Sequence, residues 1–265
     1  MFNRFLSTLS LISRFPIKGR FLKKFDVSRM DFYLPITGIV PALLGTVLFY
    51  GGYLLTESPL LTVILMLIGQ YLAFNLFHLD GLMDTADAFL GSFDREKRHA
   101  VLKDSRIGVY GFFAGMAVLS LKAGLLYTLF PGFFRFPAPL LAYPISGRFS
   151  AALIPCLTAP AKRGGLGALA KDARPYRAIA GFFTSLLLWN ALAWGMSAFL
   201  AVNEPPFWAL LAVPLISPLG SVFFARLYHR HLGGYTGDAL GAAVEIAEIL
   251  HLAASLLLLV RMEVL

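Results

Sequence analysis

The chain has 265 residues, of which 58% are hydrophobic and 14% charged, and its formal net charge is +8 at pH 7. One soluble domain of this length could not bury so much apolar surface, so the composition excludes an ordinary water-soluble protein. The single cysteine, Cys156, excludes an internal disulfide and a cysteine-rich metal site. The sequence has no internal repeat, and we expect one integral-membrane domain over residues 1–265.

The N-terminal segment alternates apolar and polar residues. Phe2, Phe5 and Leu9 recur between polar positions, many basic residues follow, and a small-residue cleavage site is lacking. This pattern predicts a helix over Met1 to Ile12 that lies on the membrane surface, and it is not typical of a cleaved signal peptide.

Seven apolar runs are long enough to cross a hydrocarbon core of roughly 30 Å, which takes about 20 helical residues. They are Leu34 to Leu55, Pro59 to Phe77, Ile107 to Phe130, Pro137 to Thr158, Ala178 to Val202, Pro205 to Leu227 and Ala239 to Val260. The sequence therefore predicts an all-α, polytopic transmembrane bundle of about seven spans.

Basic residues gather on one side of these spans. Most of the 23 lysine and arginine residues fall in the N-terminal stretch or in the connections after the second, fourth and sixth spans. The positive-inside rule therefore places the N-terminus in the cytoplasm and the C-terminus outside. We interpret the charge as contact with anionic membrane lipid and not with nucleic acid, although a phosphorylated substrate would be attracted by the same field.

The longest polar interruption of the apolar pattern carries a dense cluster of carboxylates. Asp80, Asp84 and Asp87 follow an i, i+4, i+7 spacing, which places them within roughly 60° of one helical face. Such like charges repel, and oxygen-only ligands select a hard cation, so we expect Mg²⁺ or Mn²⁺ here. A solvated acidic face with Arg95, Lys97 and Arg98 as counter-ions is the alternative, which the apolar residues flanking the acids disfavour.

Two extended motifs lie far apart in the chain. They read FHLDGLMDTADAFLGSFDREKRHAVLKDSRIGVYG from Phe77 and LGGYTGDALGAAVEIAEI from Leu232. Both resemble the cobalamin synthase family, the adenosylcobinamide-GDP ribazoletransferases, and so do the weaker segments LISRFPI near the start and KRGGLG from Lys162 to Gly167. The resemblance spans essentially the whole chain.

The resemblance implies a Mg²⁺-dependent reaction in which α-ribazole, or its 5′-phosphate, displaces GMP from adenosylcobinamide-GDP. It implies that Asp80, Asp84 and Asp87 bind the metal, with Asp104 as a fourth ligand or as the base. We take Asp87 and Asp104 as the catalytic residues without deciding which carboxylate accepts the proton of the ribose hydroxyl. The expected location is the bacterial inner membrane, with the active site facing the cytoplasm, and an oligomer is compatible with the sequence.

Further polar positions are candidates for substrate binding. They are Lys103, Ser105, Arg106, Arg148, Arg163, Thr236, Asp238 and Glu245. Contact with lipid is an equal alternative for Lys103 and Arg106, and an ordinary basic loop is an equal alternative for Arg163. Thr236 or Asp238 can also cap the helix that follows the glycine-rich turn.

Charged residues inside the predicted spans need partners or water. Lys122 lies about two turns from the outer end of its span, and we expect it to reach that surface. Arg148 lies near mid-span and must pair with Glu245 or Glu248, or point into a cavity. For Glu245 we favour a water-filled substrate cavity over pairing with an intramembrane base, and we interpret His78 as a polar anchor at the membrane boundary, with a catalytic base as the alternative.

Two other functions compete with this interpretation. Enzymes of the CDP-alcohol phosphotransferase type also carry spaced aspartates, but they typically continue with Ala-Arg and G-x-x-x-D-x-x-x-D, where this chain has Asp84-Thr-Ala-Asp87. A transporter would use Arg148, Glu245 and Glu248 for translocation, but it has no need of three stacked carboxylates at the cytoplasmic end.

Overall fold

The computed structural model describes residues 1–14, 17, 24–161, 166–200 and 213–263. Over these residues the fold is helical, and the β pairing is limited to an isolated bridge between Pro160 and Tyr235. The prediction of an all-α fold is confirmed. The candidate residue Arg163 and the first part of the predicted sixth span, from Pro205, lie outside the described residues.

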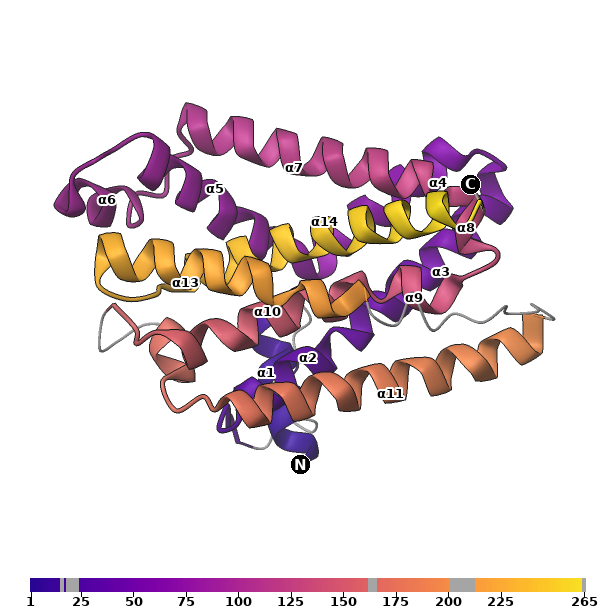
Figure 1. Ribbon diagram of the computed structural model, residues 1–265, viewed down its shortest axis with the longest axis horizontal. Helices are drawn as coiled ribbons and strands as arrows, with labels where there is room; N and C mark the ends of the chain where they lie inside the picture. Colours follow the sequence, from indigo (N-terminus) through magenta and orange to yellow (C-terminus); the bar gives the residue numbers. More distant parts are fainter. Residues whose placement is uncertain (15–16, 18–23, 162–165, 201–212, 264–265) are drawn as a thin grey trace.

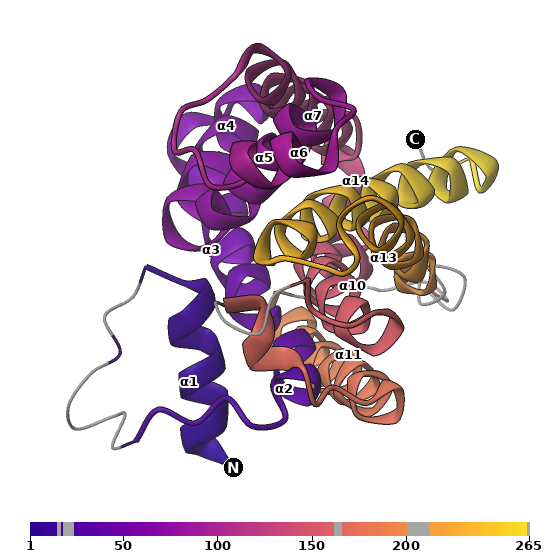
Figure 2. The same ribbon diagram turned by 90° about the vertical axis from the view of Figure 1, so that its left-hand side faces the viewer.

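The longest helices run along the long axis of the molecule, and α14 lies between α5 and α7 on one side and α10 and α13 on the other (Figures 1 and 2). The elements are α1 (Phe2–Ile12), α2 (Met30–Thr37), α3 (Ile39–Thr56), α4 (Pro59–Gln70), η1 (Tyr71–Asn75), α5 (Leu76–Leu90), α6 (Arg95–Val101), α7 (Val109–Thr128), α8 (Phe130–Phe133), α9 (Pro137–Leu141), α10 (Tyr143–Leu157), η2 (Leu166–Ala170), α11 (Pro175–Leu200), η3 (Val213–Ile216), α13 (Pro218–Leu232) and α14 (Gly237–Arg261).

Helical stretches long and apolar enough to cross a membrane number five among the described residues. They are Met30–Thr56, Pro59–Leu90, Val109–Thr128, Pro175–Gly195 and Gly237–Arg261. The predicted fourth run is divided between α9 and α10, because Pro137 and Pro144 each begin a new helix. With 15 residues each, α10 and α13 are shorter than the roughly 20 that a straight span needs. The count of seven is therefore not confirmed, and the orientation stays a prediction.

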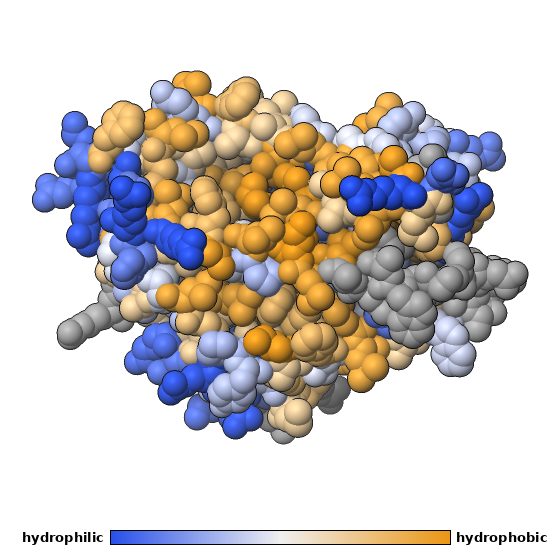
Figure 3. Space-filling model, in the orientation of Figure 1, coloured by the Kyte–Doolittle hydropathy of each residue, from blue (hydrophilic) through white to orange (hydrophobic). Residues whose placement is uncertain are grey.

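The surface agrees with an integral membrane protein. In the space-filling view, apolar side chains cover a broad central band, and hydrophilic side chains gather toward the ends of the long axis (Figure 3). Leu187 on α11 and Phe113 on α7 are each 72% exposed, so large apolar side chains face outward where a soluble protein would place polar ones.

The acidic segment continues the second apolar helix. Helix α4 leads through the π-helical turn η1 directly into α5, so that Pro59–Leu90 is one uninterrupted helical stretch. The predicted second span and the acidic motif are therefore parts of one rod and not a span followed by a separate connection. Asp80, Asp84 and Asp87 all lie on α5, as the spacing predicts.

Glycines bring the two long sequence motifs together where α5 and α14 cross. A Cβ atom at Gly81 would lie 3.0 Å from the backbone of Asp238, and one at Gly241 would lie 2.8 Å from the carbonyl oxygen of His78. Approach this close is possible because neither glycine carries a side chain. The crossing places the start of α14 beside the carboxylates of α5.

The helix predicted at the N-terminus is present as α1, which lies beside α2 at the edge of the bundle (Figure 2), and its position on the membrane surface stays a prediction. Its apolar face, including Leu9 and Ile12, is buried, whereas Phe2 is exposed. The backbone N–H of Arg14 donates to the carbonyl oxygen of Ala73, 3.0 Å away, and so ties the end of this helix to η1.

Candidate functional site

The three carboxylates of α5 lie near a fourth, Asp238 of α14. Asp80 is exposed, Asp84 and Asp87 are half-buried, and the charges of Asp80, Asp238 and Asp87 all act on Asp84. We call these four residues the acid face. Asp238 joins it because of the Gly81 contact, which the sequence did not reveal.

Asp87 also caps a helix. Its two carboxylate oxygens accept hydrogen bonds from the backbone N–H groups of Gly108 and Gly111, each at 2.8 Å, at the start of α7. A Cβ atom at either glycine would overlap this carboxylate. A negative charge at a helix N-terminus is favourable, and each oxygen keeps a lone pair for another partner. Asp87 as a metal ligand or catalytic residue stays a prediction, and the structure adds this capping contact.

Asp104 lies in the exposed connection between α6 and α7 and pairs with Arg106. The two side chains form an ion pair of 2.6 Å. Hydrogen bonds from Arg106 lower the pKa of the Asp104 carboxyl to about 2, so this group is ionised at neutral pH. Lys103, Ser105 and Arg106 are exposed beside it, and substrate binding by them stays a prediction.

The predicted metal ligands do not converge on one point. Across the described ranges, no group of three or more Asp, Glu, His or Cys side chains is close enough to hold a metal ion as the side chains stand. The acid face brings carboxylates to one surface, but Asp104 is turned toward Arg106 and Asp87 toward the backbone of α7. Its all-oxygen donor set still suits a hard cation.

Two arginines of α6 have partners other than the acid face. Arg95 donates to the carbonyl oxygen of Leu232 at 2.9 Å, and the guanidinium of Arg98 lies 2.9 Å from Nδ1 of His231. These contacts hold α6 against the end of α13. They give no support to Arg95 and Arg98 as counter-ions of a solvated acidic face, and for Lys97, which is exposed, that alternative stays open.

The glycine-rich turn before α14 packs against the segment that leads to Arg163. The N–H of Tyr235 donates to Ala159 and its carbonyl oxygen accepts from Ala161, at 3.0 and 2.9 Å. Thr236 occupies the N-cap position of α14 and donates its hydroxyl to Asp238 at 2.9 Å. The turn thus connects the segment Ala159 to Ala161 to the acid face, and the binding roles of Thr236 and Asp238 stay predictions.

A cluster of charged residues is buried where η1, α7, α10 and α14 meet. Lys122 forms ion pairs with Glu245 at 2.6 Å and with Glu248 at 2.8 Å, and Arg148 pairs with Glu248. Tyr71 donates to Glu245 at 2.6 Å, and Asn75 accepts from Arg148 at 2.6 Å. We call these six residues the buried ion cluster. Its two cations and two anions balance, which offsets part of the cost of removing charges from water.

Burial within the bundle corrects three expectations. Lys122 does not reach the outer surface, because α7 packs against α14 and leaves the side chain 0% exposed between two glutamates. Glu245 does not face a water-filled cavity, since it is also 0% exposed and paired. His78 is not a boundary anchor, because it is 4% exposed within the bundle. For Arg148, pairing with Glu248 is the arrangement found, so direct contact with substrate has no support from its position.

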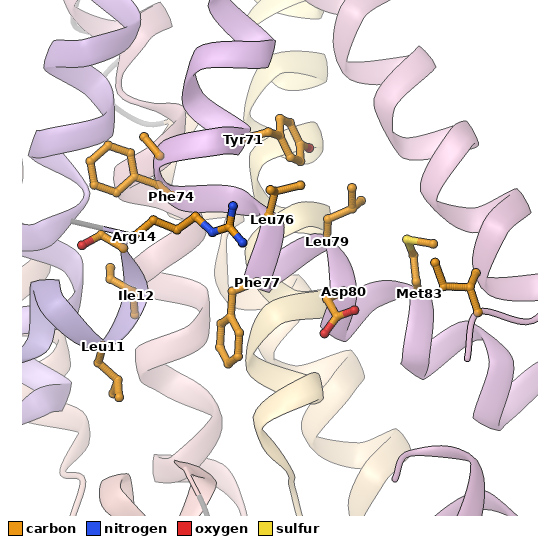
Figure 4. A pocket seen from close by; sticks show the side chains of 13 residues that line it. Leu11, Ile12, Arg14, Tyr71, Phe74, Leu76, Phe77, Leu79, Asp80 and Met83 are labelled. Carbon is orange, nitrogen blue, oxygen red and sulfur yellow. The ribbon is translucent and has the colours of Figure 1, made fainter. Parts of the chain in front are cut away.

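A cavity of about 530 Å³ lies between the end of α1 and the α5 rod, and Asp80 of the acid face is part of its wall (Figure 4). Sequence reasoning missed this cavity because it exists only where α1 is placed against η1 and α5. The segment LISRFPI was noted in the sequence, and its first four residues line the cavity.

Comparison with known proteins agrees with these features. A model of the cobalamin-5-phosphate synthase family matches residues 4–256. The adenosylcobinamide-GDP ribazoletransferase of Thermosipho melanesiensis is 32% identical, over 90% of this chain and 92% of the relative. The proteins of the same name from Pseudomonas paraeruginosa and Rhizobium johnstonii are 34% and 32% identical, over 92% and 93% of this chain and 93% of each relative. No solved structure matches this chain.

The family match covers both long motifs, and with them the acid face and the buried ion cluster. The chain therefore belongs to the cobalamin-5-phosphate synthase family, whose members named above are transferases.

Proposed function

We propose that this protein transfers α-ribazole, or its 5′-phosphate, onto adenosylcobinamide-GDP and releases GMP. Family membership and the names of the relatives support this activity. The structural observation that carries it is the acid face, because the crossing at Gly81 adds Asp238 of the second motif to the carboxylates of the first.

We propose that Asp80, Asp84, Asp87 and Asp238 hold Mg²⁺ or Mn²⁺ at the acid face. Their mutual repulsion and oxygen-only chemistry favour a hard divalent cation. Such an ion would offset the charge that develops on the pyrophosphate when GMP leaves. Side-chain rotation toward the ion is part of this proposal, since the carboxylates do not converge as they stand.

Asp104 can act as a base only after its ion pair changes. A carboxyl group with a pKa of about 2 is a weak proton acceptor at neutral pH. If a substrate phosphate draws Arg106 away, the pKa of Asp104 rises and the group becomes a better acceptor for the ribose hydroxyl proton. Arg106 would then bind phosphate, and neighbouring Lys103 would add a second positive charge.

We place the reaction at the cytoplasmic face of the bacterial inner membrane. The acid face, the basic connection after α5 and the glycine-rich turn lie toward the same end of the bundle, at the left of Figure 1. The excess of basic residues in these connections supports the cytoplasm as the compartment.

The transporter alternative finds no support in the structure. Arg148, Glu245 and Glu248, which would form its translocation site, are fully buried and bound to one another or to Lys122.

The test uses the full-length protein purified in detergent, without a sealed compartment. Supplied with adenosylcobinamide-GDP, α-ribazole and Mg²⁺, it should release GMP, and removal of divalent cations by EDTA should stop the release until Mg²⁺ is restored. Absence of GMP release from a folded protein with either form of ribazole would contradict the proposed activity, and release unaffected by EDTA would contradict the metal.

A further inference from the structure

The cavity beside α1 has an apolar wall. Leu11 at the end of α1, Phe74 in η1, and Leu76 and Phe77 in α5 line it. Phe77 is 46% exposed, so its ring is open to the cavity and not enclosed by the core. Such a wall suits a flat apolar group such as an aromatic base.

The charged side chains of Arg14 and Asp80 also line the cavity. Figure 4 shows the Arg14 side chain reaching from the end of α1 toward Leu76 and Phe77, with the Asp80 carboxylate further along the wall. Within the described ranges, no carboxylate pairs with the guanidinium of Arg14. The hydroxyl oxygen of Ser13, next to Arg14, is buried and has no hydrogen-bond partner among the described residues. The cavity therefore combines an apolar surface with a cation that has no carboxylate partner among the described residues.

The volume of the cavity suits the smaller of the two substrates of the proposed reaction. About 530 Å³ falls within the roughly 300–1,000 Å³ typical of sites for small organic ligands. A nucleoside or nucleoside monophosphate is a ligand of that size. A corrinoid that carries both an adenosyl and a GDP group is several times larger, so this cavity, which is open to the surface, cannot contain the whole molecule.

We propose that this cavity binds the α-ribazole substrate, with the benzimidazole base against Leu11, Leu76 and Phe77 and the 5′-phosphate, when present, at Arg14. The proposal rests on the proposed function above. It places the ribose near Asp80, so that a ribose hydroxyl can reach the acid face from the side of α1. There a ribose O–P bond would form as the P–O bond to GMP breaks, and the hydroxyl proton would pass to a carboxylate.

A phospholipid is the rival occupant. Its phosphate could contact Arg14 and its acyl chain could lie along Phe77, so apolar chemistry alone does not separate the two. The position of Asp80 favours ribazole, because a carboxylate can accept a hydrogen bond from a ribose hydroxyl but has no favourable contact with an acyl chain.

Equilibrium binding tests the site independently of turnover. Titration calorimetry would measure the affinities of purified full-length protein for α-ribazole and for α-ribazole 5′-phosphate. We expect Phe77→Ala to weaken both ligands about tenfold or more, and Arg14→Gln to weaken the phosphorylated ligand about tenfold while changing the other less than about twofold. Phe223→Ala and Arg230→Gln, at exposed positions on α13, are the matched controls and should bind like the unsubstituted protein.

Kinetics provide the second measurement. With thermal melting unchanged, Phe77→Ala should raise KM for ribazole and leave KM for adenosylcobinamide-GDP unchanged. Unchanged ribazole affinities in both variants would overturn the proposal, and so would a loss of affinity equal to that in the α13 controls. The proposed function would still hold in either case if the unsubstituted protein releases GMP. Native mass spectrometry that finds a phospholipid lost in Phe77→Ala but not displaced by ribazole would assign the cavity to lipid and also overturn it. Absence of GMP release from the unsubstituted protein would instead overturn the function.

Discussion

At the scale of single residues, the half-buried carboxylate of Asp84 is the most informative to change. Its position between Asp80 and Asp87 on α5, with Asp238 opposite, makes it the centre of the acid face. Asp84→Asn should lower the rate of GMP release by orders of magnitude, because it removes one charge from the proposed cation site. The melting temperature should not fall, since like-charge repulsion is relieved.

The control for this prediction is Asp94→Asn. Asp94 caps α6 by accepting from the N–H of Lys97 at 2.9 Å, and asparagine caps equally well. This variant should keep full activity. Near-normal turnover of Asp84→Asn at saturating Mg²⁺ would contradict a metal site and support the interpretation of the acid face as a solvated surface.

For Glu245, in the buried ion cluster, we expect a substitution to reduce stability, whereas for Asp84 we expect it to reduce activity alone. Glu245→Gln removes one anion and leaves Lys122 and Arg148 with Glu248 alone, in a region where all four charged groups are 0% exposed. We expect a loss of roughly 3–5 kcal/mol in stability, seen as poor expression or a much lower melting temperature. Glu263→Gln, which is exposed near the end of the chain, should behave like the unsubstituted protein. A stable Glu245→Gln protein with reduced GMP release would contradict the structural role and support a contact with substrate.

At the scale of helices, the crossing of α5 and α14 determines whether the acid face forms. A methyl group at Gly241 would lie 2.8 Å from the carbonyl oxygen of His78, which is backbone and cannot rotate away. Gly241→Ala should therefore cost roughly 1–3 kcal/mol as the helices separate, and it should reduce activity because Asp238 moves away from Asp84.

Gly124→Ala is the matched control, because nothing lies within 4 Å of a Cβ atom at that position of α7. It should be neutral or stabilising by up to about 1 kcal/mol through helix propensity. Thermal melting and GMP release of both variants measure the two effects. Equal behaviour of the two alanine variants would show that the crossing does not depend on the glycine.

The attachment of α1 should depend on pH through Asp26. Hydrogen bonds from Ser28 and Arg4 lower the pKa of the Asp26 carboxyl to about 2, from a usual value of 3.8. A lowered folded-state pKa means that the contribution to stability is complete above the unfolded-state value and is lost as the pH falls through the folded-state value. Hydrogen exchange of the α1 amides should thus be constant from pH 8 to about 5, once corrected for intrinsic rates, and protection should fall between about pH 4 and 2.

Asp26→Asn gives the comparison for this measurement. The α1 amides of this variant should exchange faster at pH 7, and their protection should not fall further between about pH 4 and 2. The reason is that the variant lacks the ionisable group that pairs with Arg4 at 3.0 Å. The same step in both proteins would assign the acid transition to other carboxyl groups.

At the scale of the whole molecule, the predicted orientation can be tested by cysteine labelling. In a Cys156→Ser background, cysteines at Lys97 and Lys171 should react with impermeant reagents only after the cytoplasmic face is opened. A cysteine at Glu57, in the exposed connection between α3 and α4, should react from outside. Labelling of Lys97→Cys in intact cells would show that the orientation is the reverse of the predicted one and that the acid face lies outside the cytoplasm.

Local features of this fold could be predicted from the sequence because they depend on neighbours along the chain. The spacing of Asp80, Asp84 and Asp87 was enough to place them on one helical face, and α5 confirms the helix. Long apolar runs indicated membrane helices, although prolines divide one of them into α9 and α10. The two long motifs were enough to recognise the family.

Periodicity alone says which face of a helix a residue occupies, but not which helix lies opposite that face. Lys122 was therefore expected at the surface, and only the packing of α7 against α14 placed it between Glu245 and Glu248. The capping of α7 by Asp87, the addition of Asp238 to the acid face and the cavity between Arg14 and Asp80 also join segments distant in the chain. The sequence by itself determined the membrane environment, the helices and the shared face of the α5 carboxylates, whereas the tertiary structure decided which charges are paired and which residues line the cavity beside α1, because both depend on contacts across helices.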